Sequence, residues 1–228
     1  MPLRTYVNRR AMGAATLVDV YPINLLLSGR RCVVIGGGGV AERKVDSLLE
    51  AGGAVRVVAP EVTPHLASLA EAGRIEWRRA EATEADLADA FLVILATDDT
   101  GLNARLAAAA DAAGKLVNAV DQPEACNFYV PAAIRRGPLV LTIATGGASP
   151  ALAKRLRREI EAHFGPEYGE LAALLGRLRE MIDQTGRTQP ERARAWERVV
   201  NSQVLDYLRD GRTEEAEALA RELLMTDA

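Results

Sequence analysis

The first 120 residues alternate between short apolar runs and segments with helical periodicity. Residues 31–35 and 91–97 are rich in Val, Ile and Leu, as expected for strands buried on both faces of a parallel sheet. Residues 40–52 and 99–114 repeat apolar side chains at helical spacing. Further strands are predicted at 54–60, 74–79 and 115–120, with a short helix at 62–73. This alternation predicts an α/β fold, a Rossmann-type doubly wound parallel sheet.

The pattern changes after Pro123. Two short strands are predicted around a Gly137-Pro138 turn, and an amphipathic helix then begins at Pro150. From Glu167 onward the chain reads as helical. We therefore divide it into a flexible N-terminal extension (1–19), a nucleotide-binding Rossmann domain (20–122), a small mixed α/β region (123–165) and a C-terminal helical domain (166–228).

Composition narrows the possible partners. The formal net charge is −3 and no basic block occurs, so a nucleic-acid partner is not expected. No stretch reaches the roughly 20 apolar residues that a membrane span needs. The opening segment does not read as a signal peptide, and a cytoplasmic protein is expected. The two cysteines and two histidines show no metal-ligand spacing, which excludes a histidine-rich metal site.

A glycine motif, Gly36-x-Gly38-x-x-Ala41, lies between the first strand and the first helix. Gly36 would permit the tight turn, and Gly38 would let the backbone approach a pyrophosphate. Ala41 would allow close packing of helix on sheet, while free N–H groups at the helix start would face the anion. In this strand–turn–helix context the motif predicts NAD binding.

Polar residues follow the next strands. Glu61, after Pro60, could accept hydrogen bonds from the adenosine ribose and so favour NAD over NADP; it could equally be a charge at a helix start. Thr97 and Asp98 end a central strand, where ligands of parallel sheets bind. Asp98 or Asp99 could instead cap the helix that follows.

Asn118 and Asp121 end the last strand of the predicted sheet. A carboxylate there would lie near a bound nicotinamide and could take a proton while hydride leaves to the cofactor, with Asn118 contacting the substrate. Spacing alone favours this base role no more than that of a loop-capping aspartate.

A small-residue turn precedes the amphipathic helix. Its N–H groups and hydroxyls could bind an anionic substrate, or it could be a capped helix start with a solvated basic face. The candidate substrate contacts in this turn are Thr145, Gly146, Gly147 and Ser149.

Several strings taken together resemble a known family. VVIGGGGVAERK, LATDD, NAVD, FYVPA and TGGASPALAKRLR, in this order and at these separations, resemble precorrin-2 dehydrogenase, the dehydrogenase–chelatase module of siroheme synthase. The resemblance is strong over about residues 20–165 and looser in the helical tail. It implies an NAD-dependent oxidation of precorrin-2 to sirohydrochlorin, and in some members the insertion of ferrous iron, a ferrochelatase (lyase) reaction in siroheme biosynthesis.

The resemblance also assigns residues. Gly39 and Val40, and then Pro60 and Glu61, match cofactor-contacting pairs, and Asp121 matches the family's essential aspartate. The same carboxylate could receive protons as Fe²⁺ or Co²⁺ enters the macrocycle, so it is also the one candidate for a metal role. Thr145 matches the hydroxyl position of the substrate turn. The resemblance implies a homodimer in which the middle regions pair, in line with apolar strands around Gly137-Pro138 that lack partners.

Alternatives of other classes remain. The chain could be a non-enzymatic NAD sensor whose helical tail signals to a partner, or a chelatase only. The family's bifunctional synthases continue into a methyltransferase domain, and since this sequence stops at Ala228, uroporphyrinogen methylation is not expected. The end product served, the metal, and the roles of the N-terminal extension and helical tail are left open.

Overall fold

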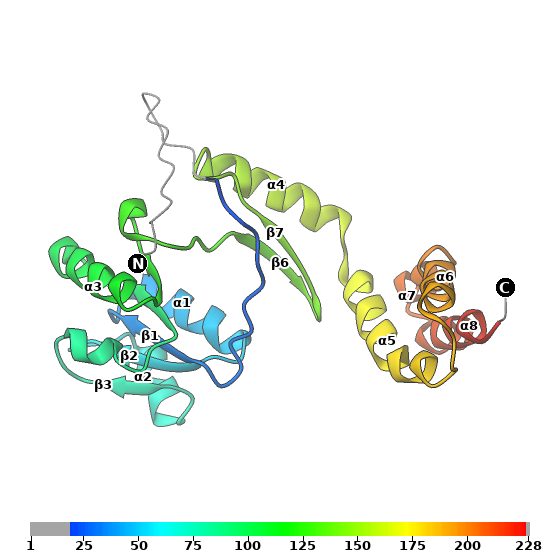
Figure 1. The fold of residues 1–228 in the computed structure, drawn as a ribbon, viewed down its shortest axis with the longest axis horizontal. Coiled ribbons are helices and arrows are strands. Elements are labelled where there is room, and N and C mark those ends of the chain that lie inside the picture. Colours follow the sequence, from blue (N-terminus) through cyan, green and yellow to red (C-terminus); the bar gives the residue numbers. More distant parts are fainter. Residues whose placement is uncertain (1–18, 227–228) are drawn as a thin grey trace, which may run out of the picture. The chain divides into compact units, whose positions relative to one another are not determined.

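The computed structural model describes residues 19–226, so the predicted flexible extension at 1–19 lies almost wholly outside the described residues. The chain divides into two compact units, one at 21–130 and one formed by the residues from Pro131 onward together with those before Tyr21 (Figure 1). Each has its own core and is described by itself. Among residues 19–226, no helix combines the length and apolar character needed to cross a membrane.

The first unit is a five-stranded parallel sheet in the order β3-β2-β1-β4-β5. Figure 1 labels β1, β2 and β3 of this sheet. The strands are β1 Arg31–Ile35, β2 Ala54–Val58, β3 Glu76–Arg78, β4 Leu92–Leu95 and β5 Leu116–Ala119. The helices are α1 Gly39–Glu50, α2 Pro64–Glu71 and α3 Thr100–Ala112, with short 3₁₀ segments η1 Glu84–Leu87 and η2 Pro123–Ala125. This is the doubly wound Rossmann-type fold that the apolar periodicity predicts.

Successive strand residues point to opposite faces of the sheet and build two cores. Val34 and Ile94 pack with α1 and α2, through Val45 and Leu66, on one face. On the other face, β-strand residues pack against α3 and η1. Because both faces are covered, the inner strands need apolar side chains at every position, which explains their continuous Val, Ile and Leu runs.

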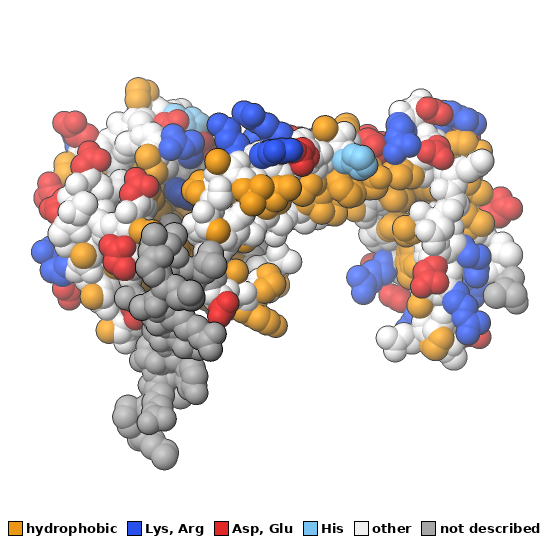
Figure 2. Space-filling view, turned by 90° about the horizontal axis from the view of Figure 1, so that it is seen from above, with side chains coloured by type: hydrophobic (Ala, Val, Ile, Leu, Met, Phe, Trp, Pro, Cys, Tyr) orange, Lys and Arg blue, Asp and Glu red, His pale blue; other side chains and the backbone are white. Residues whose placement is uncertain are grey.

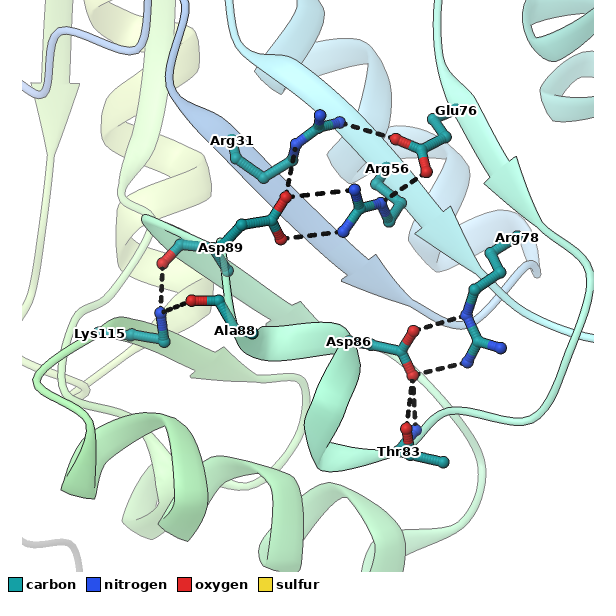
Figure 3. A network of polar contacts seen from close by, with 10 residues as sticks. Arg31, Arg56, Glu76, Arg78, Thr83, Asp86, Ala88, Asp89 and Lys115 are labelled. Atoms are coloured by element: carbon teal, nitrogen blue, oxygen red, sulfur yellow. Dashed lines mark hydrogen bonds and ion pairs between the residues drawn. The ribbon is translucent and has the colours of Figure 1, made fainter.

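A network of ion pairs ties β1, β2 and β3 to the segment before β4 (Figure 3). Arg56 bonds Glu76 and Asp89, and Arg31 reaches the same two carboxylates. Separately, Asp86 of η1 accepts hydrogen bonds from the Thr83 N–H at 2.8 Å and from Arg78 at 2.6 Å (Figure 3). Asp86 is 8% exposed, whereas the Asp89 side chain is half exposed, so the Asp86 contacts should contribute more to stability.

We expect Asp86 to make the unfolding free energy depend on acid pH. Burial alone would raise the pKa of this carboxyl, but hydrogen bonds from Thr83 and Arg78 outweigh burial, so the pKa lies below its ordinary value of 3.8. The folded state therefore binds the proton less readily than the unfolded chain, and the stabilisation is present above that value and lost as pH falls below it.

Asp86→Asn should lower the unfolding free energy at pH 7 by about 1–3 kcal/mol, with a smaller difference from wild type near pH 3. Urea unfolding at both pH values measures this. Asp89→Asn, at a half-exposed ion pair, is the matched control and should cost less. An Asp86→Asn penalty that is the same at both pH values would contradict the assignment.

The first unit runs past Gln122, where the predicted domain ends, because residues 123–130 return along β5. The Asn127 side chain accepts from the Val117 N–H at 2.8 Å and donates to the Lys115 carbonyl oxygen at 2.8 Å. The Asn127 N–H donates back to the Val117 carbonyl oxygen. These bonds satisfy backbone groups on the open edge of β5.

In its described residues, the second unit contains a hairpin and five helices. The elements are β6 Ala132–Arg136, β7 Leu139–Ile143, α4 Pro150–His163, α5 Pro166–Asp183, α6 Gln189–Val200, α7 Val204–Arg209 and α8 Thr213–Met225. Gly137 adopts a positive φ of 54° at the hairpin turn, and Ser149 caps α4 by accepting the Leu152 N–H. Helices α5 to α8 bury a common apolar core that includes Leu174 and Val199.

Candidate active site

The carboxyl ends of the parallel strands meet at one edge of the Rossmann sheet. Ile35 at the end of β1 pairs with Val58 of β2 and Leu95 of β4, and Leu95 pairs with Ala119 of β5. The chain order reverses between β1 and β4, where doubly wound sheets bind their ligands. The loops after β1, β2, β4 and β5 therefore converge there. Together with the start of α1 and the end of β5, they contain the sequence-predicted residues of this unit.

The first two glycines of the run serve the fold. Gly36 has φ +116°, and a Cβ on it would lie 2.4 Å from the Ala96 carbonyl oxygen after β4. A Cβ on Gly37 would lie 2.0 Å from the Glu61 carbonyl oxygen after β2. The predicted tight-turn role of Gly36 thus has a steric basis. Gly37 was missed by the motif, although its place inside an unbroken glycine run was a signal.

The next two glycines leave space open. Gly38 and Gly39 are exposed, and a Cβ on either would meet nothing within 4 Å. Helix α1 begins at Gly39 without a side-chain cap, so its first N–H groups are available to an anion. Val40 is 36% exposed at this helix start, whereas Ala41 is fully buried against the sheet. A shallow cradle of backbone amides fits a dinucleotide pyrophosphate.

Pro60 and Glu61 lie exposed beyond β2. Helix α2 has Thr63 as its N-cap and no acidic residue in its first turn, so Glu61 lies outside that helix. The alternative that Glu61 serves as a helix-start charge is thereby weakened. Arg79, which follows β3, donates to the Pro60 carbonyl oxygen at 3.2 Å. The Thr63 N–H donates to the Gly37 carbonyl oxygen at 2.9 Å, which holds this loop beside the glycine turn.

Some residues after β4 make hydrogen bonds within the fold, whereas Asp98 is exposed. Asp99 caps α3 by accepting the Leu102 N–H at 2.8 Å, which leaves Asp98 exposed. The Thr97 hydroxyl donates to Asn103 Oδ1 at 2.7 Å, and Asn103, 1% exposed, donates back to the Thr97 carbonyl oxygen. Asn103 thus holds Thr97 in place, a contact that the sequence pattern did not reveal because Asn103 lies within the helical run.

Asp121, two residues after the end of β5, has an unusual backbone conformation. Its φ is +60°, and among the described residues it alone has a positive φ without being glycine. Such conformations cost energy and gather at functional sites. Its side chain is exposed and has no hydrogen-bond or ion-pair partner among residues 19–226. A loop-capping role would require such a partner, so the geometry favours a carboxylate held free for a ligand.

Asn118 faces the protein interior. It is 9% exposed, and its amide nitrogen donates to the Phe128 carbonyl oxygen at 3.0 Å. The structure thus gives this side chain a role in holding the segment after β5. Its predicted contact with substrate stays a prediction.

The small-residue turn belongs to the second unit. Gly146 and Gly147 have φ of 58° and 82°, values that glycine adopts without strain. The Thr145 hydroxyl accepts from the Ser149 N–H at 3.2 Å and donates to the Ser149 carbonyl oxygen at 3.3 Å. The turn is therefore closed by its own hydroxyl.

Two further observations concern metal sites and surface hollows. Residues 19–226 contain no group of three or more His, Cys, Asp or Glu side chains arranged to hold a metal ion, and the metal role of Asp121 stays a prediction. A surface hollow between α1 and α2 is lined by Asp46, His65 and Arg74, among others, and contains none of the predicted site residues.

Three family models match the chain in succession. Residues 23–132 match a model described as putative NAD(P)-binding, residues 136–163 the central region of sirohaem biosynthesis proteins, and residues 167–224 the sirohaem synthase dimerisation region. The first match confirms the predicted dinucleotide cofactor. The dimerisation model covers the helices after α4, C-terminal to the region for which the sequence predicted the dimer contact.

Similar proteins agree. The chain is 40% identical to a siroheme synthase of Pseudomonas putida over 207 residues, 91% of this chain and 45% of that one. It is 39% identical to a siroheme synthase of Nitrosococcus oceani, over 86% of this chain and 42% of the other. The chain thus spans less than half the length of these curated relatives.

A solved structure aligns with most of this chain. The structure named "SirC, precorrin-2 dehydrogenase" aligns with a TM-score of 0.75 at 27% identity, over 89% of this chain and 100% of that one. In this chain the Rossmann domain, the hairpin with α4, and the helices from α5 onward follow one another in the order of the three matched models. Over most of its length the chain is therefore similar to the part of the siroheme synthases that contains the NAD(P)-binding, central and dimerisation regions.

Proposed function

We propose that this chain catalyses the NAD-dependent oxidation of precorrin-2 to sirohydrochlorin. The observation that carries the proposal is the unpartnered Asp121 carboxylate, which shares the carboxyl edge of the sheet with the open Gly38–Gly39 cradle. The likeness to a structure named precorrin-2 dehydrogenase supports the same reaction. The substrate loses two hydrogens overall, one as hydride and one as a proton.

Residues of the Rossmann unit would hold the cofactor. The amides of Gly38 to Ala41 would hold the pyrophosphate, and Glu61 would accept hydrogen bonds from the adenosine ribose, which would favour NAD over NADP. Thr97 and Asp98 border the crevice between β1 and β4. NAD, when bound, accepts the hydride. The remaining work of this chain is to hold the substrate carbon in place and to receive the proton at a carboxylate oxygen of Asp121.

The substrate's carboxylates need cationic and amide partners. In the second unit, the N–H groups of Gly146 and Gly147 have no backbone partner among the described residues. Lys154 and Arg158 on α4 are exposed and make no ion pair within the described part of the chain, whereas Arg155 pairs with Glu159 at 2.7 Å. We propose that this turn and the free cations bind substrate carboxylates.

An anaerobic assay tests the function directly. Precorrin-2 and NAD are incubated with the protein, and NADH absorbance is followed together with the spectrum of sirohydrochlorin. We expect one NADH for each sirohydrochlorin formed, with NADP a poorer cofactor. Binding of NAD without any turnover would favour the sensor alternative instead.

The second unit also supports a homodimer. No residue of α4 is buried, and its apolar side chain Leu152 is 46% exposed. In the neighbouring hairpin Val140 is 37% exposed. Figure 2 shows hydrophobic side chains gathered in a band along this part of the chain. An amphipathic helix with its apolar face uncovered indicates a surface that a second copy would bury.

We expect a dimer at micromolar concentration by light scattering, and Leu152→Glu should convert it to monomer, because a charge would be buried at the interface. Val200→Glu introduces the same charge at a 50% exposed position of α6, and it tests whether the dimer contact lies in the bundle of α5 to α8 instead. Dissociation by Val200→Glu alone would place the contact in that bundle. A wild-type monomer at this concentration would refute the dimer.

A further inference from the structure

Cys126 is bonded to the backbone on both sides of Asp121. The Ala119 N–H donates to Cys126 Sγ at 3.2 Å. The thiol lies 3.2 Å from the Ala119 carbonyl oxygen and 3.3 Å from the Gln122 carbonyl oxygen, and its single proton can be donated to one of them at a time. One side chain thus joins the end of β5 to the residue that follows Asp121.

The bonded segment needs such a restraint. Asp121 has φ +60°, in the left-handed region that an L-residue adopts at a cost. Its own carboxylate makes no bond that would hold this conformation within the described residues. The turn must therefore be held by its neighbours. The Asn118 amide adds to the clamp by approaching Cys126 Sγ at 3.5 Å while it bonds Phe128.

The thiol is suited to this part because it stays neutral. Burial raises the pKa of Cys126 above its ordinary value of 9.0, despite the opposing hydrogen bond from Ala119. A neutral thiol is both a donor and an acceptor, and it uses both capacities here. A thiolate could not donate to either carbonyl oxygen.

We propose that Cys126 is a positioning residue for the reaction: its thiol, bonded to Ala119 and Gln122, holds the Asp121 turn and thereby aims the carboxylate at the substrate. This inference rests on the proposed base role of Asp121. Cys32 is fully buried in β1 and lies level with Leu92 and Leu116, at the end of the strands opposite to this loop. It offers the same chemical change as a matched control.

The test compares Cys126→Ala, Cys126→Ser and Cys32→Ala in the full chain. In Cys126→Ala we expect kcat to fall about ten- to a hundredfold, the cost of a slightly misplaced base. KM for precorrin-2 and the affinity for NAD should stay unchanged. Cys126→Ser should recover part of the loss because a hydroxyl can both donate and accept. Cys32→Ala should leave kcat at the wild-type value.

A readout without substrate or cofactor accompanies the kinetics. Amide hydrogen exchange at Ala119 should accelerate in Cys126→Ala, slow again in Cys126→Ser, and be unaffected in Cys32→Ala, because only the first variant removes the acceptor. A double-mutant cycle completes the test: in an Asp121→Asn background, Cys126→Ala should cause no further loss of the residual turnover.

Three outcomes would overturn the inference. The first is a Cys126→Ala kcat no lower than that of Cys32→Ala, and the second is an equal fractional loss in the Asp121→Asn background. If Asp121→Asn itself has reduced turnover, either result refutes only the positioning role of Cys126 and leaves the base role of Asp121 intact. The third is wild-type turnover in Asp121→Asn, which removes the base role and the positioning role with it.

Discussion

Asp121→Asn is expected to reduce kcat for precorrin-2 oxidation by about 10²- to 10⁴-fold, the usual contribution of a positioned general base. Asn is the informative replacement because it keeps the size of the side chain and tolerates the left-handed backbone that Asp121 adopts. Ala would combine loss of the carboxylate with added backbone cost, so its effect would be harder to assign.

The measurement is anaerobic NADH production at saturating NAD, with NAD affinity measured separately by calorimetry. NAD affinity should be unchanged, since Asp121 is assigned to the proton and not to the cofactor. Glu71→Gln, which removes an exposed carboxylate at the end of α2, is the control and should behave as wild type. Undiminished turnover in Asp121→Asn would refute the base role and leave the reaction without its proton acceptor.

The second large effect concerns two glycines of the same turn, Gly38 and Gly36, for which we expect different consequences of substitution by Ala. Gly38→Ala should weaken NAD binding at least about tenfold, or 1.4 kcal/mol, because the added methyl group enters the space through which the pyrophosphate approaches. The folded protein itself has room for that methyl group, with no atom within 4 Å and an ordinary φ of −82°. The unfolding temperature should therefore stay at the wild-type value.

Gly36→Ala, in contrast, should first of all lower the stability of the folded protein. Its Cβ would lie 2.4 Å from the Ala96 carbonyl oxygen at φ +116°, so we expect a loss of more than about 2 kcal/mol of stability. Calorimetric unfolding and NAD titration of both variants give the comparison. Unchanged NAD affinity in Gly38→Ala would show that the open cradle does not receive the pyrophosphate. Equal losses of stability in the two variants would show that Gly38 serves the fold as Gly36 does.

Local chemistry made much of this molecule predictable. Buried parallel strands are recognisable in the sequence as apolar runs, as in 31–35 and 91–97. A Pro directly after a Ser predicts the start of α4. The glycine turn was visible because positive φ and close backbone approach require glycine wherever they occur. Since parallel strands end at a common edge, even the grouping of Gly38, Asp98 and Asp121 at one edge follows from their positions after strands.

Only the tertiary structure decided what each side chain there contacts. It separated Gly37, wedged against Glu61, from Gly38, which faces open space. It turned Asn118 inward, tied Thr97 to Asn103, and brought Cys126 against Ala119. Spacing along a chain specifies periodicity and turns, because those depend on neighbouring residues. Hydrogen-bond partners depend on which segments the packed cores bring together, and a single sequence does not encode those distances in any local pattern.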